Sequence, residues 1–141
     1  MTTLTRRYRF SASHRLDAPS LSPEENQRLF GKCNNPFGHG HNYVLEVTVA
    51  GEPDTVSGLI LPLSRLDELV AGKILRLFRN RYINVDVGQF ARLVPTTENV
   101  TQVVADLLGQ NWREHMGENA ARLERVRIEE TGRNSCEICL N

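Results

Sequence analysis

The stretch HGHNYVLEVTV, residues 39–49, decides the fold expected for this chain because its residue types alternate with a period of two. Such alternation is typical of a half-buried β-strand, in which successive side chains point to opposite faces of a sheet. Glu46 and Thr48 fall on one face. The other face carries His39, His41, Tyr43, Leu45, Val47 and Val49. The predicted strand therefore presents two histidines on its apolar side.

A second strand is predicted just upstream, over residues 8–14, with the same alternation. Its apolar face carries Tyr8, Phe10, Ala12 and His14. The intervening residues 16–37 are rich in Pro, Ser, Asn and charge, which predicts a long excursion with a short helix around residues 24–29. Long loops on rigid scaffolds often carry function. A third histidine is thus expected beside the other two, at the start of a candidate functional loop.

Two longer helices are expected in the second half of the chain. The first runs from Ser64, its predicted N-cap, to Phe78, and Gly72 weakens it by about 1 kcal/mol relative to alanine. The second begins at Thr96, with Glu98 in its first turn, where a negative charge is favourable. The helical spacing of apolar residues predicts that each buries one face.

Two further strands are predicted over residues 123–131 and 135–140, joined by a turn at residues 132–134. The resulting order, ββααββ, differs from the alternation of a parallel sheet and favours an α+β fold. We expect one domain, residues 1–141, with a four-stranded antiparallel sheet and two helices on one face. Such a sheet has two open edges, which a small protein must protect or pair with a neighbour.

The composition excludes some classes of partner. Lysine plus arginine and aspartate plus glutamate each number 17, so no global charge favours nucleic acid or an anionic membrane. No segment approaches the roughly 20 apolar residues of a membrane span, and the N-terminus lacks the apolar centre of a signal peptide. Three cysteines cannot all pair within one chain, which favours reduced thiols. We expect a cytoplasmic protein that binds neither nucleic acid nor membrane.

The three clustered histidines predict a metal centre. His39 and His41 project to the same side of a strand and can close on one ion at about 2.0–2.1 Å. His14 would complete the arrangement of three ligands and one open position that is typical of catalytic zinc. The alternative is three buried histidines satisfied by hydrogen bonds, but one Zn²⁺ ion would satisfy all three at once. The fourth histidine, His115, is expected at the surface.

The cysteines differ in what their positions suggest. Cys33 lies six residues before His39, and a thiol near a divalent cation and Lys32 would ionise more readily, giving a base or nucleophile. An inert buried cysteine is the alternative. Cys136 and Cys139 would lie on opposite faces of a strand, so neither a metal site nor a redox pair is expected there.

One carboxylate is predicted to point into the protein. Glu130 shares a strand face with Val126 and Ile128, whereas Glu129 faces the other way. A carboxylate in this position needs partners. It could form a salt bridge with arginine or lysine, or it could accept the two parallel N–H donors that a 2-amino-4-oxopterin or a guanine offers.

Together these segments resemble the 6-pyruvoyltetrahydropterin synthase and 6-carboxytetrahydropterin synthase family over nearly the whole chain. The middle segment, with its C-N-N-P-x-G-H-G-H-N-Y run, is the most specific and is closer to the pyruvoyl branch. The matching segments are residues 10–14 (FSASH), 31–43 (GKCNNPFGHGHNY), 95–99 (PTTEN) and 130–134 (ETGRN).

The resemblance implies both a site and an assembly. It implies Zn²⁺ on the three histidines, proton abstraction by Cys33, a pterin anchored by Glu130, and a pocket lined by Thr97 and Glu98. It also implies a tunnelling fold that assembles as a homohexamer, a dimer of trimers, with sites between subunits. In this family, zinc binds the side-chain hydroxyls of 7,8-dihydroneopterin triphosphate and stabilises the developing enolate while triphosphate leaves.

One segment departs from the family pattern. Where members carry an Asp-His pair, this chain has Arg79 and Asn80. Asn80 cannot exchange a proton near neutral pH, and Arg79 can hold a phosphate or oxyanion but cannot shuttle protons. Arg15 and Lys32 are further candidates for holding substrate charge.

Three functional hypotheses therefore remain. The first is a zinc-dependent lyase acting on 7,8-dihydroneopterin triphosphate or a close relative. The second is an enzyme of the same fold that forms the 6-carboxy product or cleaves the side chain as an aldolase would. The third is a catalytically silent pterin-binding subunit.

Overall fold

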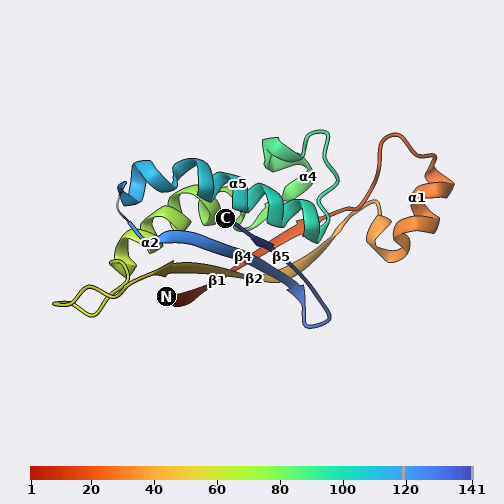
Figure 1. The fold of residues 1–141 in the computed structure, drawn as a ribbon. Helices are drawn as coiled ribbons and strands as arrows, with labels where there is room; N and C mark the ends of the chain where they lie inside the picture. The colour runs from red at the N-terminus through yellow and green to blue at the C-terminus, as the bar shows by residue number, and fades with distance from the viewer. Residues whose placement is uncertain (119, 141) are drawn as a thin grey trace.

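The computed structural model describes residues 1–118 and 120–140 and has an α+β architecture (Figure 1). One sheet is covered on one face by helices. The strands are β1 (Thr2–His14), β2 (His39–Gly51), β3 (Arg81–Tyr82), β4 (Arg122–Thr131) and β5 (Asn134–Cys139). The α-helices are α1 (Pro23–Phe30), α2 (Leu63–Val70), α3 (Arg76–Phe78), α4 (Ile83–Asp86) and α5 (Thr97–Met116). The remaining helical segments are η1 (Gly31–Asn34), η2 (Ala71–Leu75) and η3 (Gly88–Phe90).

The sheet has the strand order β3-β1-β2-β4-β5 and is mixed. β1 and β2 pair antiparallel along their full length, from Thr2 opposite Gly51 to His14 opposite His39. β4 and β5 continue the antiparallel ladder, but β3 pairs parallel to β1. The prediction of a four-stranded antiparallel sheet is therefore wrong in the number of strands and in the direction of one of them. The reason is that β3 has only two residues, too few to show an alternating pattern.

The predicted helices are present with small corrections. The first is a continuous helical run from α2 through η2 to α3, ending at Phe78 as predicted. Its N-cap is Pro62 rather than Ser64, and no side chain bonds to the cap. α5 begins as expected, with the Thr96 hydroxyl accepting a hydrogen bond from the Asn99 N–H. Among the described residues, no helix combines the length and apolar character needed to cross a membrane.

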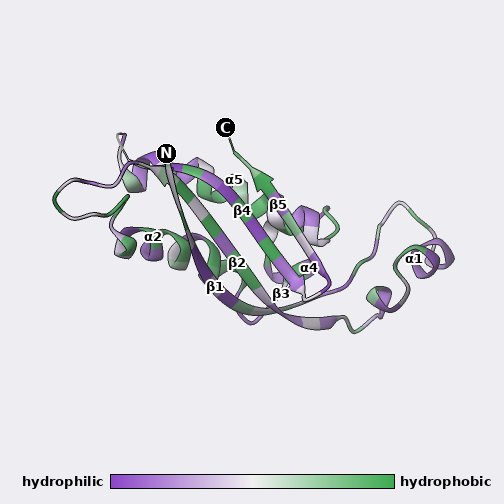
Figure 2. Cartoon of the chain, turned by 60° about the horizontal axis from the view of Figure 1, so that its bottom comes forward, coloured by the Kyte–Doolittle hydropathy of each residue, from purple (hydrophilic) through white to green (hydrophobic). Residues whose placement is uncertain are grey.

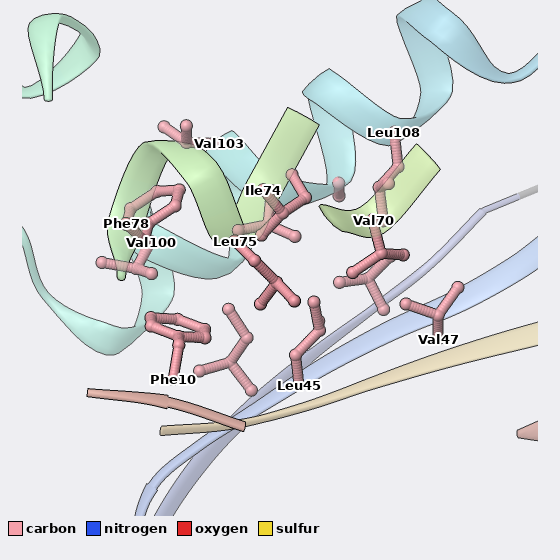
Figure 3. Packing of buried hydrophobic residues seen from close by; sticks show 14 of the residues in the cluster. Phe10, Leu45, Val47, Val70, Ile74, Leu75, Phe78, Val100, Val103 and Leu108 are labelled. Carbon is pink, nitrogen blue, oxygen red and sulfur yellow. The ribbon is translucent and has the colours of Figure 1, made fainter. Parts of the chain in front are cut away.

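The hydrophobic core lies between the sheet and the helices (Figure 3). Phe10 points from β1 towards Phe78 of α3, and Leu45 and Val47 point from β2 towards Val70 of α2. These side chains are at most 4% exposed. The helices are thereby fixed over the apolar face of the sheet, the same face on which the three histidines were predicted.

The opposite, helix-free face of the sheet is polar, and the strand residues alternate in hydropathy accordingly (Figure 2). Glu46, although only 8% exposed, has partners there. Its carboxylate accepts hydrogen bonds from Arg7 Nε at 3.0 Å and Arg127 Nη1 at 3.4 Å. Thr5 and Thr48 pair through their hydroxyls at 2.7 Å. This face is thus stabilised by cross-strand polar pairs.

The residues between β1 and β2 form an arm, α1 and η1, that extends beyond the end of the sheet (Figure 1). Its helix starts with the Ser22–Glu25 capping box. The arm is tied back to the chain that follows His14, because Leu16 N–H donates to the Cys33 carbonyl at 2.8 Å. Asn34 Nδ2 in turn donates to the Leu16 carbonyl at 2.7 Å. Cys33 is therefore held near the histidine end of the sheet through its backbone.

Candidate metal centre

The sheet register brings the three predicted histidines together. His14 lies directly opposite His39, and Ala12 lies opposite His41, so all three imidazoles project from one face of adjacent strands. Their ring centroids are 4.7 to 5.0 Å apart, and a set of potential ligand nitrogens, one from each ring, lies within 4.8 Å. In the part of the chain that is described, this is the group of side chains close enough to hold one ion.

The hydrogen bonds of His14 fix which of its nitrogens is available. Its Nδ1 donates to the Pro95 carbonyl at 2.8 Å, because a carbonyl oxygen can only accept. Its Nε2 must then carry a free lone pair, and this buried atom has no hydrogen-bond partner among the described residues. His41 Nε2 is buried and unpartnered in the same sense. Two imidazole nitrogens without partners, close together, fit a metal ion. A histidine that binds a metal through one nitrogen usually donates its other N–H to an acceptor, as His14 does to the Pro95 carbonyl.

Burial also keeps these rings in the protonation state that metal binding requires. Burial lowers the pKa of His14 below its ordinary value of 6.5, although the Pro95 carbonyl acts in the opposite direction. Burial likewise lowers the pKa of His41, with the nearby Glu130 carboxylate opposing it. Neutral imidazole is the form that binds metals. The site is therefore ready for a cation near neutral pH.

Glu130 lies beside the histidines, pointing inward as the sequence predicted. Its side chain is 11% exposed, and its Oε1 is 3.5 Å from His41 Nε2. Its Oε2 is 4.0 Å from His14 Nε2. No arginine or lysine of the described chain forms a salt bridge with it, so the alternative of such a bridge is not what the structure shows. The carboxylate instead contributes negative charge to the candidate metal centre.

The first turn of α5 holds Glu130 in place. The Thr97 hydroxyl donates to Glu130 Oε2 at 2.7 Å. Asn134 Nδ2 donates to the same hydroxyl oxygen at 3.1 Å, which directs the Thr97 proton towards Glu130. Thr97 is buried, whereas Glu98 is exposed and makes none of the described contacts with this network. The structure thus brings Thr97 to the site and leaves Glu98 outside it.

The structure does not bring Cys33 into the histidine cluster. Cys33 lies in η1, is half-buried, and is a free thiol. The other two cysteines lie on β5, where Cys136 is half-buried and Cys139 is exposed, in agreement with their predicted opposite faces. His115 is bonded to the Arg65 carbonyl and lies away from the cluster.

Sequence reasoning missed the contact that selects the His14 tautomer. The Pro95 carbonyl is 81 positions away in the sequence from His14. Tyr43 was predicted on the correct face, but its hydroxyl, 3.4 Å from His14 Nδ1, was not assigned to the site. No local signal in the sequence reports these contacts, since the first depends on where the start of α5 docks and the second on the pairing of β1 with β2.

The fold and the site define a class: an α+β protein whose sheet carries a three-histidine centre able to hold a metal ion beside a buried carboxylate. A sequence model described as 6-pyruvoyl tetrahydropterin synthase matches residues 3–139. The chain belongs to this family.

Individual proteins agree with this assignment. The chain is 48% identical over 105 residues to the 6-pyruvoyl tetrahydrobiopterin synthase of Homo sapiens, covering 74% of this chain and 72% of the human one. It is 40% identical over 131 residues to that of Poecilia reticulata, covering 93% and 85%. The structure of Caenorhabditis elegans 6-pyruvoyl tetrahydropterin synthase superposes with a TM-score of 0.88 at 37% identity, covering 99% and 96%.

Proposed function

We propose that this chain is a metal-dependent lyase of pterin metabolism that acts on 7,8-dihydroneopterin triphosphate or a close relative. The observation that carries the proposal is the cluster of His14, His39 and His41 beside a carboxylate held by Thr97. Two of these histidines, His14 and His41, bury an Nε2 that has no partner among the described residues. The names of its relatives, which are 6-pyruvoyl tetrahydrobiopterin synthases, supply the reaction class.

The three histidines would hold Zn²⁺, the ion that suits imidazole ligands in this number. When bound, the ion supplies Lewis acidity that polarises oxygens of a ligand. Burial maintains the neutral state of His14 and His41, and the hydrogen bond to the Pro95 carbonyl fixes which nitrogen of His14 carries the proton. The chain's own contribution is thus a preformed set of imidazole donors.

Glu130 would bind the pterin ring through the ring N–H and amino groups. Each carboxylate oxygen can accept two hydrogen bonds, so the bond from Thr97 leaves acceptor capacity on both oxygens. Thr97 and Asn134 position the carboxylate, and Glu98 remains a candidate for the outer part of the pocket. Cys33 would serve as the base that removes a proton from the substrate side chain.

A homohexamer, built as a dimer of trimers with sites between subunits, is part of this proposal. Two features support it. Among the described strand pairs, β3 covers β1 only at Ala12 and Ser13, so most of the β1 edge is open, as is the outer edge of β5. Cys33 lies on an arm outside the histidine cluster of its own chain. Light scattering coupled to size exclusion tests the assembly, and a monomer at micromolar concentration would contradict it.

The test of function is to incubate zinc-loaded protein with 7,8-dihydroneopterin triphosphate and to identify the products by mass spectrometry. A pyruvoyl pterin supports the proposal. A carboxy or hydroxymethyl pterin would indicate the second hypothesis, a same-fold enzyme with another product. Tight binding without turnover would indicate a silent subunit. These outcomes must be separated because Arg79 and Asn80 replace the Asp-His pair of the family.

Cys33→Ala tests the base, and Cys139→Ala is its matched control because it removes an exposed thiol from β5. We expect the Cys33 variant to lose about 10²–10⁴-fold in kcat, the usual contribution of a general base. The Cys139 variant should keep its rate. Equal rates for the two variants would remove Cys33 from the mechanism.

A further inference from the structure

The turn that carries Arg79 and Asn80 is pinned against the edge of β1. Asn80 adopts a left-handed conformation, with φ of 57°, which asparagine tolerates better than most residues. Its N–H donates to the Ser11 carbonyl at 2.7 Å. The next residue, Arg81, pairs with Ala12 in the parallel β1–β3 ladder. The backbone of this turn is therefore held at a fixed place beside the sheet.

Two adjoining cavities lie at this turn. Their volumes are about 520 and 390 Å³, and Ser11, Asn42 and Asn80 line both. Arg81 lines the larger cavity, and Arg9 and Arg79 line the smaller. Combined, the cavities fall within the size range of small-molecule sites.

The three arginines at these cavities lack acidic partners. No carboxylate of the described chain forms a salt bridge with Arg9, Arg79 or Arg81, whereas Arg7 and Arg127 on the sheet share Glu46. Asp86 is the acidic residue that lines the larger cavity, and its Oδ2 already accepts the Tyr82 N–H at 2.8 Å. In a chain with no net charge, this local excess of positive charge favours an anion.

The neutral groups at the cavities offer donors as well. The Ser11 hydroxyl donates to Asn42 Oδ1 at 2.7 Å, so the acceptor of that amide is occupied and its NH₂ group remains available. Guanidinium groups are donors only and match the oxygens of phosphate. The lining is thus rich in donors and positively charged.

We propose that this pocket, formed by Arg9, Ser11, Asn42, Arg79, Asn80 and Arg81, binds an oligophosphate anion. Its volume and its three guanidinium groups suit a chain of phosphates better than a single one. His41 of the metal centre also lines the larger cavity, so the pocket adjoins that centre. Two sources share the chemistry: a free oligophosphate, and the triphosphate tail of a pterin, the latter resting on the proposed function.

The test is calorimetric titration of the full chain with inorganic triphosphate. Arg79→Gln removes one charge from the pocket, and Arg76→Gln is the matched control, an exposed arginine on α3 that lines neither cavity. We expect one site per chain, an affinity that falls by about tenfold or more in the Arg79 variant, and no more than about a twofold change in the control. Equal affinities for the two variants, or no saturable binding, would overturn the proposal.

Two further variants distinguish the arginine pocket from the metal centre as the place where triphosphate binds. Asn80→Asp keeps a residue that tolerates the left-handed conformation but places a negative charge in the pocket, so it should weaken binding at least as much as Arg79→Gln. Triphosphate also chelates metal ions, so it could bind at the metal centre instead of the arginine pocket. His39→Ala tests this possibility because it removes one of the metal ligands. Binding that survives Arg79→Gln but is lost in His39→Ala would overturn the proposal. Circular dichroism confirms that each variant is folded.

Competition identifies the source of the anion. If 7,8-dihydroneopterin triphosphate displaces inorganic triphosphate from the His39→Ala chain in an Arg79-dependent manner, the pocket takes the substrate's tail. If it does not, the pocket takes free oligophosphate. Both results retain the pocket, and neither depends on turnover, so failure of the proposed function leaves this inference testable.

Discussion

The two ends of the β1–β2 ladder use polar side chains in opposite ways. In the half nearer Thr2 and Gly51, up to Tyr8 opposite Leu45, polar groups are paired within the chain. Arg6 donates to both oxygens of Asp67 at 2.7 and 2.9 Å, and the Tyr8 hydroxyl donates to the same carboxylate at 2.8 Å. At the other end, His14 and His41 bury ring nitrogens that find no partner among the described residues.

This difference separates what holds the fold from what serves a ligand. A buried polar atom without a partner costs about 1–3 kcal/mol. Because the same two strands satisfy their polar groups at one end, the unsatisfied nitrogens at the other are a property of the site rather than of poor packing. The unpartnered nitrogens at the histidine end are therefore expected to gain a partner from a bound cation. The hydrogen bonds of Asp67 are expected to be unaffected by that cation.

The largest expected effect comes from removing one ligand. His39→Ala should weaken Zn²⁺ binding by at least about 100-fold, since second-shell changes alone already cost 10–100-fold. His39 is half-buried, so the variant should still fold. Competition with a chromophoric chelator measures the affinity. His115→Ala, at the one other histidine of the chain, is the control and should leave it unchanged. An equal loss of Zn²⁺ affinity in both variants would contradict the assignment of the metal site to the histidine end.

Metal binding should also stabilise the protein. Zinc at 100 times its dissociation constant adds about 2.7 kcal/mol to the free energy of unfolding if only the folded state binds it. The melting temperature should therefore rise with zinc in the wild type and in Asp67→Asn, but not in His39→Ala. A zinc-independent melting temperature in the wild type would remove the metal centre from the interpretation.

A smaller effect is expected from the carboxylate beside the histidines. Glu130→Gln keeps the shape of the side chain but removes the charge that would accept pterin N–H groups. A hydrogen bond to a charged group is worth about 1.5–3 kcal/mol, so pterin affinity should fall by about 10- to 100-fold. Pterin fluorescence measures it. Glu129→Gln, on the neighbouring residue of β4, is the matched control, and an equal loss there would show that Glu130 has no special role.

The pH dependence of stability should separate the two ends in metal-free protein. Burial lowers the pKa of His14 and His41 below 6.5, so the unfolded chain binds more protons as the pH falls below 6.5. Their contribution to stability is present above pH 6.5 and is lost as the pH falls towards their folded pKa values. The hydrogen bond from Arg6 lowers the pKa of Asp67 below 3.8, so that contribution is lost only below pH 3.8.

Thermal melting as a function of pH measures this separation. Metal-free wild type should lose stability between about pH 6.5 and 5, and His41→Ala should lose less over the same interval. Asp67→Asn should follow the wild type there and differ only at lower pH. A wild-type melting temperature that is constant down to about pH 5 would contradict the assignment of buried neutral histidines.

The sequence predicted those parts of the fold that have a local pattern. β1 and β2 were found from their period of two, and this also placed three histidines and Tyr43 on one face. α5 was found from its cap at Thr96 and its apolar stripe. The inward direction of Glu130 followed from the register of its strand. In each case, a single segment contained the whole signal.

What the sequence could not predict depends on contacts between distant segments. The β3 strand exists because the turn at Asn80 docks on Ser11, and two residues have no periodicity to detect. The tautomer of His14 depends on the Pro95 carbonyl, which is brought there by α5. The pocket at Arg79 likewise needs β1, β2 and the turn together. These features are properties of docking, which no local pattern records.

The smallest expected effect is at the far end of the ladder. Asp67→Asn keeps one acceptor oxygen but removes the charge that Arg6 and Tyr8 approach. Because Arg6 and Asp67 are about 40% exposed, solvent screens their attraction, and the melting temperature should fall by at most a few degrees. Asp106→Asn, an exposed carboxylate on α5, is the control and should change it less. Zinc affinity should be unchanged in both variants. If Asp67→Asn weakened zinc binding as strongly as His39→Ala, the two ends of the ladder would be coupled, and the division between a structural end and a ligand-binding end would fail.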